Sequence, residues 1–454
     1  MSAALTDRRG RLLTAAVASS VAVAFADSSI VVLALPNLYG AFNTTIVGVA
    51  WVITSYNVVV AMGALALAGL SRRLDARRTA QIGLAVFAIA SVGCAVSWSL
   101  AALIAFRCVQ GLGAALLLAA SLPLLGGLIG SRERGTALWT TAAVLGAALG
   151  PVLGGVLTQL FDWRAIFVVQ TPVAAVAFVA ARGAPALPAD PPGRRGRGAG
   201  AADVALALVF AALVGALFLA VLLVITVWGY SPIGGAALVS SLPAAALAVR
   251  PLERRLPRAA AVWGGAALLA GGLVGLALLP SANAVLAVWA LALCGAGLGL
   301  AVPLLSQAAL DLHAGLARSG TFTVGVRHLG LVLALASIAP LLASEVPNTG
   351  DKALLKATAV LLDSPAGLDK KVPVALDLRG AFAKARDGET PDLSEPFNKH
   401  GARTDSALAE TRDKLVGTIE ATITRAFRPA FFLSAAFAAL ALAAAVLFRR
   451  RLLS

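Results

Sequence analysis

The chain has 454 residues, of which 59% are hydrophobic and only 13% charged, and its formal net charge is +15. Soluble globular domains average roughly 45–50% apolar and about 25% charged residues, so this composition excludes a water-soluble enzyme. It also excludes a nucleic-acid partner, because the charges separate long apolar segments instead of lining a polar fold; we therefore expect a multi-pass membrane protein.

Twelve apolar runs are long enough to cross the roughly 30 Å hydrocarbon core as helices, which takes about 20 residues each. They cover residues 12–35, 46–70, 79–98, 100–129, 136–160, 165–181, 204–228, 232–249, 260–280, 284–310, 321–343 and 427–448. The predicted fold class is therefore all-α, with twelve transmembrane helices. Cys94, Cys108 and Cys294 fall inside these runs as small apolar residues, so we expect neither disulfides nor a metal site.

Arginine is distributed unevenly over the short segments between the runs. The N-terminus and the short segments on its side hold 21 arginines, whereas the short loops on the other side hold one, Arg164. Because short cytoplasmic loops carry an excess of basic residues, we expect both termini to be cytoplasmic, in a protein of the cell (inner) membrane.

The sequence indicates two six-helix halves. Residues 182–203, rich in Pro, Gly and Arg, predict a cytoplasmic linker between an N-terminal half at 1–181 and a C-terminal half that begins at 204. Two tripeptides recur at similar offsets, which indicates a duplicated unit as in many secondary transporters. They are Arg72-Arg73-Leu74, repeated as Arg254-Arg255-Leu256, and Gly111-Leu112-Gly113, repeated as Gly297-Leu298-Gly299.

A polar segment at 344–426 separates helices 7–11, at 204–343, from helix 12 and the cytoplasmic tail, at 427–454. We expect it on the outer side of the membrane. It holds all seven lysines, and three stretches have helical periodicity: 351–363, 374–386 and 404–426. Glu410 and Lys414 have the i,i+4 spacing of a helical ion pair. A solvated loop and a small ordered extracytoplasmic cap, able to bind a partner, are the two alternatives.

Two charges lie deep inside apolar spans, Asp27 in the first and Arg107 in the fourth. At 1.5 Å per residue both lie about 8–10 Å below the outer membrane edge, so they are able to pair if their helices are neighbours. Because arginine stays protonated, Asp27 is the better proton carrier. Separation from Arg107 would favour proton uptake by Asp27, and renewed contact would favour release. A purely structural ion pair is the alternative.

Span five contains a Gly-x-x-x-Gly-Pro-x-x-Gly-Gly pattern, formed by Gly146, Gly150, Pro151, Gly154 and Gly155. The four-residue spacing of the glycines lets another helix backbone approach closely, and the proline favours a kink.

This pattern is similar to the antiporter motif of the drug:proton antiporter branch of the major facilitator superfamily, and almost all of the twelve spans resemble the 12-helix form of that branch. Residues 107–111, Arg-Cys-Val-Gln-Gly, resemble its fourth-helix Arg-x-x-Gln-Gly motif. Asp27 with Ile30–Pro36 resembles the first-helix motif, and Trp51–Asn57 resembles the start of the second helix. The resemblance implies two six-helix halves, proton coupling through Arg107, no catalytic residue and no cofactor, with the proton gradient as the energy source.

Residues 69–78 resemble the cytoplasmic gate motif of the family, whose positions here include Gly69, Arg72, Arg73, Asp75 and Arg77. Arg73 stands where the family has an aspartate, and Asp75 is displaced from that place by two residues, so the resemblance implies a rewired latch. Arg327 and His328, in a late-helix signature of the branch, lie about two turns into span eleven, and we interpret Arg327 as a snorkelling side chain.

These observations predict a monomeric proton-coupled exporter that works by alternating access, with Asp27 and Arg107 coupling the proton. Tyr56, Asn57 and Gln110 are the candidates to line the substrate cavity. Because few polar residues occur in the spans, a hydrophobic or amphipathic small molecule in the lipid bilayer is the expected substrate. The alternatives are a lipid or glycolipid exporter that uses the outer segment, and a non-transporting membrane scaffold or sensor.

Overall fold

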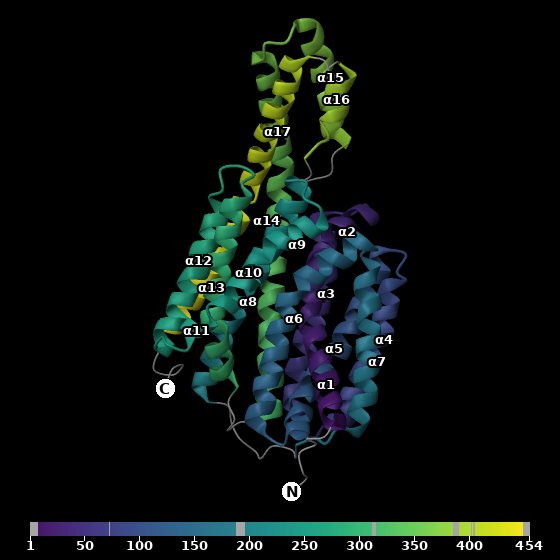
Figure 1. The fold of residues 1–454 in the computed structure, drawn as a ribbon, viewed down its shortest axis with the longest axis vertical. Coiled ribbons are helices and arrows are strands. Elements are labelled where there is room, and N and C mark those ends of the chain that lie inside the picture. The colour runs from purple at the N-terminus through teal and green to yellow at the C-terminus, as the bar shows by residue number, and fades with distance from the viewer. Residues whose placement is uncertain are drawn as a thin grey trace.

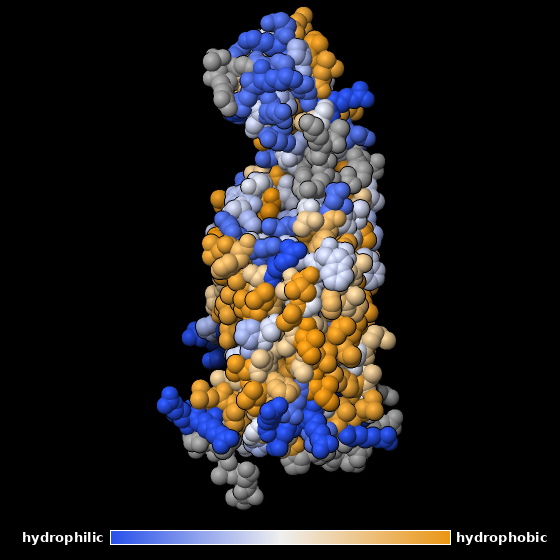
Figure 2. Space-filling view, turned by 90° about the vertical axis from the view of Figure 1, so that its right-hand side faces the viewer, coloured by the Kyte–Doolittle hydropathy of each residue, from blue (hydrophilic) through white to orange (hydrophobic). Residues whose placement is uncertain are grey.

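The computed structural model describes residues 8–71, 73–187, 196–310, 315–384, 390–400, 402 and 405–447. Over these residues the chain is helical without strands, and twelve helical segments are long and apolar enough to cross a membrane. The predicted all-α fold class and the twelve spans are therefore confirmed. In Figure 2 the bundle presents a largely apolar surface, with charged side chains at one end and a polar projection at the other.

The first half of the chain begins at the end of the bundle where the N-terminus lies (Figure 1). Its helices are α1 (Arg8–Val32), α2 (Leu35–Ala41), α3 (Ile46–Leu70), α4 (Ala76–Ala95), α5 (Leu100–Ile129), α6 (Arg132–Leu160) and α7 (Arg164–Gly183). Four begin where a side-chain oxygen accepts a backbone N–H of the first turn. These capping residues are Thr45 of α3, Asp75 of α4, Ser99 of α5 and Ser131 of α6.

The second half contains more helices, and several of them are short. They are α8 (Arg197–Leu222), the π-helix η1 (Leu223–Val227), α9 (Pro232–Val239), α10 (Ser241–Ala248), α11 (Arg250–Glu253), α12 (Arg258–Ala277), α13 (Ala284–Ala309), α14 (Leu316–Asp363), α15 (Leu368–Lys384), α16 (Ser394–Lys399), α17 (Ser406–Ala426) and α18 (Arg428–Leu447). The span expected at 232–249 is divided between α9 and α10. Pro243 has no N–H to donate to the Val239 carbonyl oxygen, which explains the break.

A close-packed glycine pair recurs in the two halves. Gly83 of α4 faces Gly113 of α5, and a Cβ on either would lie 2.8 Å from the carbonyl oxygen of the other. In the second half a Cβ on Gly265 of α12 would lie 2.6 Å from the carbonyl oxygen of Gly297 of α13. Gly113 therefore corresponds to Gly297, 184 residues later. The alignment of Gly111 with Gly297 was wrong by two residues, because a Gly-Leu-Gly tripeptide does not reveal which glycine faces which neighbour.

The glycines of the span-five pattern hold α6 against α1. A Cβ on any of three glycines would collide with α1 between residues 22 and 30; the three are Gly146, Gly150 and Gly154. Asp27 lies within this contact. Gly155 faces α9 instead, where a Cβ would lie 2.7 Å from the Pro232 carbonyl oxygen. The pattern thus packs α6 against both halves and fixes the height of Asp27.

The described residues of 344–426 form a helical projection beyond the bundle (Figure 1). Helix α14 has 48 residues, or about 72 Å at 1.5 Å per residue, more than twice the thickness of the hydrocarbon core. It runs on through Pro347, where we expected the span to have ended. The projection has its own buried side chains, which include Ala357, Leu378, Phe397 and Leu415. An ordered cap is therefore the alternative that the structure supports, and Glu410 and Lys414 form a 2.8 Å ion pair.

Gly265→Ala is expected to lower the melting temperature of the purified protein. The new Cβ would press on the backbone of α13, which cannot yield without separating two helices, and overpacking of this kind costs about 1–3 kcal/mol. The control is the adjacent Gly264→Ala, whose Cβ would meet nothing within 4 Å. Equal losses of melting temperature in the two variants would contradict the packing role of the glycine pair.

Candidate functional site

Asp27 of α1 and Arg107 of α5 form an ion pair inside the bundle. Asp27 Oδ2 lies 2.6 Å from Arg107 Nη1, and both side chains are 0% exposed. Arg107 Nε also donates to the Val52 carbonyl oxygen of α3 (2.9 Å), and its guanidinium lies 4.3 Å from the centroid of the Tyr56 ring. The structure brings into contact the two charges that the sequence places at matching depths.

Two glutamines close a hydrogen-bonded ring around this pair. Arg107 Nη1 donates to Gln110 Oε1 (2.6 Å), Gln110 Nε2 donates to Gln170 Oε1 (2.7 Å), and Gln170 Nε2 donates to Asp27 Oδ1 (3.0 Å). We call Asp27, Arg107, Gln110 and Gln170 the polar ring; it joins α1, α5 and α7. Gln110 also donates to Ser91 Oγ of α4 (2.9 Å). The buried charges are thus paired and hydrogen-bonded, which buried charges require.

Gln170 is the member of the ring that the sequence analysis missed. It lies on α7, in the apolar run at 165–181, and is buried (3% exposed). A polar side chain in the middle of such a run was an available signal, because amide groups in hydrocarbon also need partners. Gln170 carries no charge and does not belong to the motifs that resemble the family, so neither signal indicates it.

Tyr56, Asn57 and Gln110, the candidates to line the cavity, are each 0% exposed, and Tyr56 and Gln110 contact Arg107. The Tyr56 hydroxyl donates to the Ala24 carbonyl oxygen (3.0 Å). Asn57 Nδ2 donates to the Ile53 carbonyl oxygen of its own helix (2.8 Å). None of the three belongs to the wall of the central cavity in this conformation.

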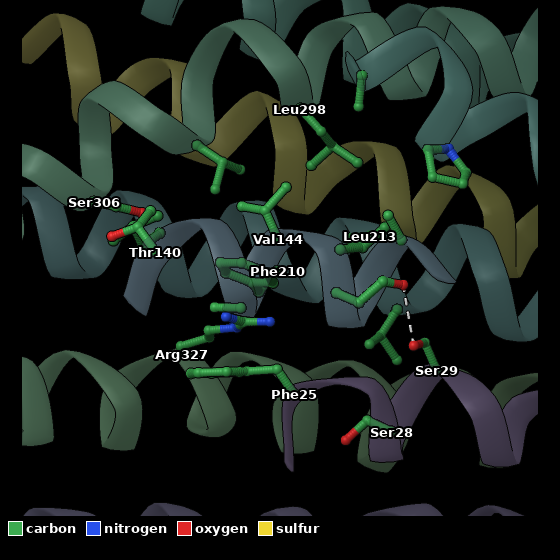
Figure 3. Close-up of a pocket in the computed structure, with 18 of the residues that line it drawn as sticks. Phe25, Ser28, Ser29, Thr140, Val144, Phe210, Leu213, Leu298, Ser306 and Arg327 are labelled. Carbon is green, nitrogen blue, oxygen red and sulfur yellow. Dashed lines mark hydrogen bonds between the residues drawn. The ribbon is translucent and has the colours of Figure 1, made fainter. Parts of the chain in front are cut away.

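A cavity opens between the two halves (Figure 3). Its wall is formed by α1 and α6 of the first half and by α8, α10, α13 and α14 of the second, with Arg250 at the start of α11. Empty space of about 1410 Å³, including the open mouth, is surrounded by mostly apolar side chains. The hydroxyl-bearing residues in the wall are Ser28, Ser29, Thr140, Ser306 and Thr323. An apolar pocket with a few polar groups is typical of small-molecule sites.

Arg327 does not snorkel to the membrane surface as we expected. It lines the cavity, with its guanidinium 4.3 Å from the centroid of the Phe25 ring and 3.9 Å from that of Phe210. His328 also lines the cavity and is buried, with Nδ1 2.8 Å from the Val324 carbonyl oxygen. The direction of α14 explains the difference, because the face that carries Arg327 is turned toward α1 and α8.

Ser28 and Ser29 connect the polar ring to the cavity. They follow Asp27 directly on α1, and both belong to the cavity wall (Figure 3). Ser28 Oγ donates to Asn57 Oδ1 (3.0 Å), and Ser29 Oγ donates to the Ala147 carbonyl oxygen of α6 (3.1 Å). A movement of α1 that follows a change of charge on Asp27 would therefore alter the cavity wall.

Two residues of the gate motif form hydrogen bonds, one at the start of α4 and one to the chain just after α7. Asp75 Oδ1 accepts the backbone N–H of Arg78 (2.8 Å) and so caps α4. Arg77 Nε donates to the Ala184 carbonyl oxygen just after α7 (3.1 Å). Arg73 is exposed, a Cβ on Gly69 would meet nothing within 4 Å, and Arg72 lies outside the described residues.

A family model described as Major Facilitator Superfamily matches residues 17–342. The methylenomycin A resistance protein of Bacillus subtilis (strain 168) is 37% identical over 158 residues, 34% of this chain and 34% of that protein. The drug efflux pump JefA of Mycobacterium tuberculosis (strain ATCC 25618 / H37Rv) is 32% identical over 174 residues, 38% of this chain and 34% of that protein. The chain thus spans about a third of the length of these relatives.

Among solved structures, a bacterial homolog of the human lysosomal transporter Spinster, in an inward-facing and occupied conformation, has a similar fold. The two chains are 16% identical, the TM-score is 0.67, and the match covers 98% of each chain. At this identity the likeness concerns the fold alone.

Gln170→Leu is expected to lower the melting temperature, because it leaves Asp27 Oδ1 and one Gln110 N–H without a partner, at about 1–3 kcal/mol for each buried group. Thr171→Val is the control on the same helix, since the Thr171 hydroxyl donates only to its own helix, at Phe167. Combined with Asp27→Asn, the loss from Gln170→Leu should shrink. The same loss in both backgrounds would show that Gln170 does not act on Asp27.

Proposed function

The chain belongs to the major facilitator superfamily, and from this we propose that it is a proton-coupled secondary active exporter of hydrophobic or amphipathic small molecules. Its twelve apolar helical segments make it a multi-pass membrane protein, and its family is one of transporters rather than enzymes. The observation that carries the proposal is the fully buried ion pair of Asp27 and Arg107, one residue away from the cavity wall.

Asp27 is the proposed proton carrier. Its partner Arg107 remains charged and is held by Val52, Gln110 and the Tyr56 ring, so protonation of Asp27 removes the Coulomb attraction without releasing the arginine. Helix α1 is then freed relative to α5, and Ser28 and Ser29 move with it. Proton release restores the pair. Coupled to rocking of the two halves, this cycle is alternating access.

The same proposal assigns an orientation. The positive-inside rule puts both termini in the cytoplasm and the projection on the outer side of the cell membrane. Strongly hydrophilic residues gather at the end of the bundle opposite the projection in Figure 2, where the positive-inside rule expects the cytoplasmic arginines. Transport by a monomer and energy from the proton gradient, without a cofactor, complete the proposal.

Asp27→Asn is expected to abolish substrate-driven proton movement in proteoliposomes while the protein still folds, because asparagine retains the shape but takes up no proton. Asp162→Asn is the matched control. It removes the carboxylate of an ion pair with Arg164 that is about half exposed (46% for Asp162) and should change nothing. Undiminished proton movement in folded Asp27→Asn protein would overturn the proposed coupling.

A lipid substrate is the second candidate function, and the projection favours it. Large apolar side chains there are 58–72% exposed, although the rest of the projection is polar; they are Leu355 and Leu362 of α14 and Leu368, Val372 and Leu376 of α15. Such side chains would shield an acyl chain on its way out of the outer leaflet.

Replacing Leu368, Val372 and Leu376 together by serine separates the two functions. If the chain exports lipid, lipid transfer to acceptor vesicles should fall several-fold, while efflux of a soluble dye should be unchanged. The control replaces the exposed polar residues Asp369 and Arg379 of the same helix by serine. Unchanged lipid transfer in the triple variant would argue against the lipid function.

A further inference from the structure

The charges that line the cavity are of one sign. Among the described residues of its wall there is no aspartate or glutamate, whereas Arg250, Arg327 and the imidazole of His328 are present. Asp203 of α8 is buried, accepts a hydrogen bond from Thr323 Oγ1 (2.9 Å) and is not part of the wall. From the described part of the wall, a ligand in this cavity therefore meets positive but no negative side chains.

Arg327 is held between two aromatic rings, as Figure 3 shows, with Phe25 on one side and Phe210 on the other. The two rings occupy equivalent positions of the two halves. Ala22 of α1 and Ala207 of α8 each meet a glycine of the neighbouring helix at the carbonyl oxygen, and each is followed three residues later by one of these phenylalanines. The guanidinium thus lies between equivalent residues of the two halves, in the wall of the cavity that separates them.

The contacts with the two rings do not use the N–H donors of the Arg327 guanidinium. The rings contact the guanidinium at its central carbon, and a ring face stabilises a cation without forming in-plane hydrogen bonds. Arg327 Nε has no hydrogen-bond partner, and no carboxylate in the described part of the chain pairs with this side chain. A guanidinium presents five N–H donors in a planar fork that matches carboxylate and phosphate oxygens.

We propose that Arg327 binds the acidic head group of an amphipathic substrate, a carboxylate or a phosphate, while the apolar wall of the cavity holds its hydrocarbon body. The inference rests on the proposed transport function and narrows its substrate class from amphiphiles in general to acidic ones. A cationic amphiphile is disfavoured at this site, because it would bring a further positive charge next to arginines in a wall whose described residues include no carboxylate.

The test uses the full chain in lipid nanodiscs, without a proton gradient, and four probes built on a chain of twelve carbons. They are dodecanoate, dodecyl phosphate, dodecanol and dodecyltrimethylammonium, each corrected for binding to empty nanodiscs. Both acidic probes should bind about tenfold or more tightly than dodecanol, the factor expected from a charge-assisted hydrogen bond in a buried site, and the cation should bind most weakly. A preference for dodecyl phosphate would indicate a lipid head group as the source, and a preference for dodecanoate a small carboxylic acid.

Arg327→Gln should abolish the discrimination between acid and alcohol, and Arg327→Lys should retain part of it as a point charge. Arg164→Gln removes an exposed arginine outside the cavity and should change nothing. Equal binding of acid and alcohol by the native chain would overturn the proposal, even if Arg327→Gln failed to fold. Loss of discrimination in Arg250→Gln but not in Arg327→Gln would overturn it too. Because no gradient is present, these results are independent of proton coupling through Asp27.

Discussion

A charged side chain in the middle of a membrane span costs at least about 2.5–3.5 kcal/mol, and Asp27 and Arg107 carry that cost together, 2.6 Å apart. Removing one partner of such a pair destabilises the fold by about 3–5 kcal/mol, because the other charge stays buried without a partner. The surrounding structure follows from this constraint. Gln110 accepts a hydrogen bond from Arg107 and Gln170 donates one to Asp27, and the glycines of α6 keep α1 at the height where Asp27 meets Arg107.

The duplicated halves differ in their charges although they share their packing. With Gly113 equivalent to Gly297, Arg107 corresponds to Leu291, and with Ala22 equivalent to Ala207, Asp27 corresponds to Ala212. The second half thus has the helix contacts of the first without its ion pair. Conversely, Arg250 and Arg327, the arginines in the described wall of the cavity, both belong to the second half. By our proposals, the first half carries the proton and the second half binds the substrate.

The sequence was most informative where one property decides the structure. Apolar run length predicts the twelve spans, and depth along a helix predicts that Asp27 can meet Arg107. Depth does not give rotation about the helix axis, and for that reason Tyr56 and Asn57 were expected on the cavity wall. For the same reason, the sequence does not reveal that Arg327 lies between the rings of Phe25 and Phe210. The span predicted at 321–343 continues as α14 to Asp363, and α14 packs on α17.

Helix α14 joins the centre of the molecule to its far tip without a break. Arg327 and Asp363 lie on the same helix, 36 residues and about 54 Å apart at 1.5 Å per residue. A rod of this length is a lever: a tilt of about 10° at the cavity displaces its end by about 9 Å, given that length. Any change in the tilt of α14 at the cavity would therefore be enlarged at the outer end of the projection, because the helix is continuous between them.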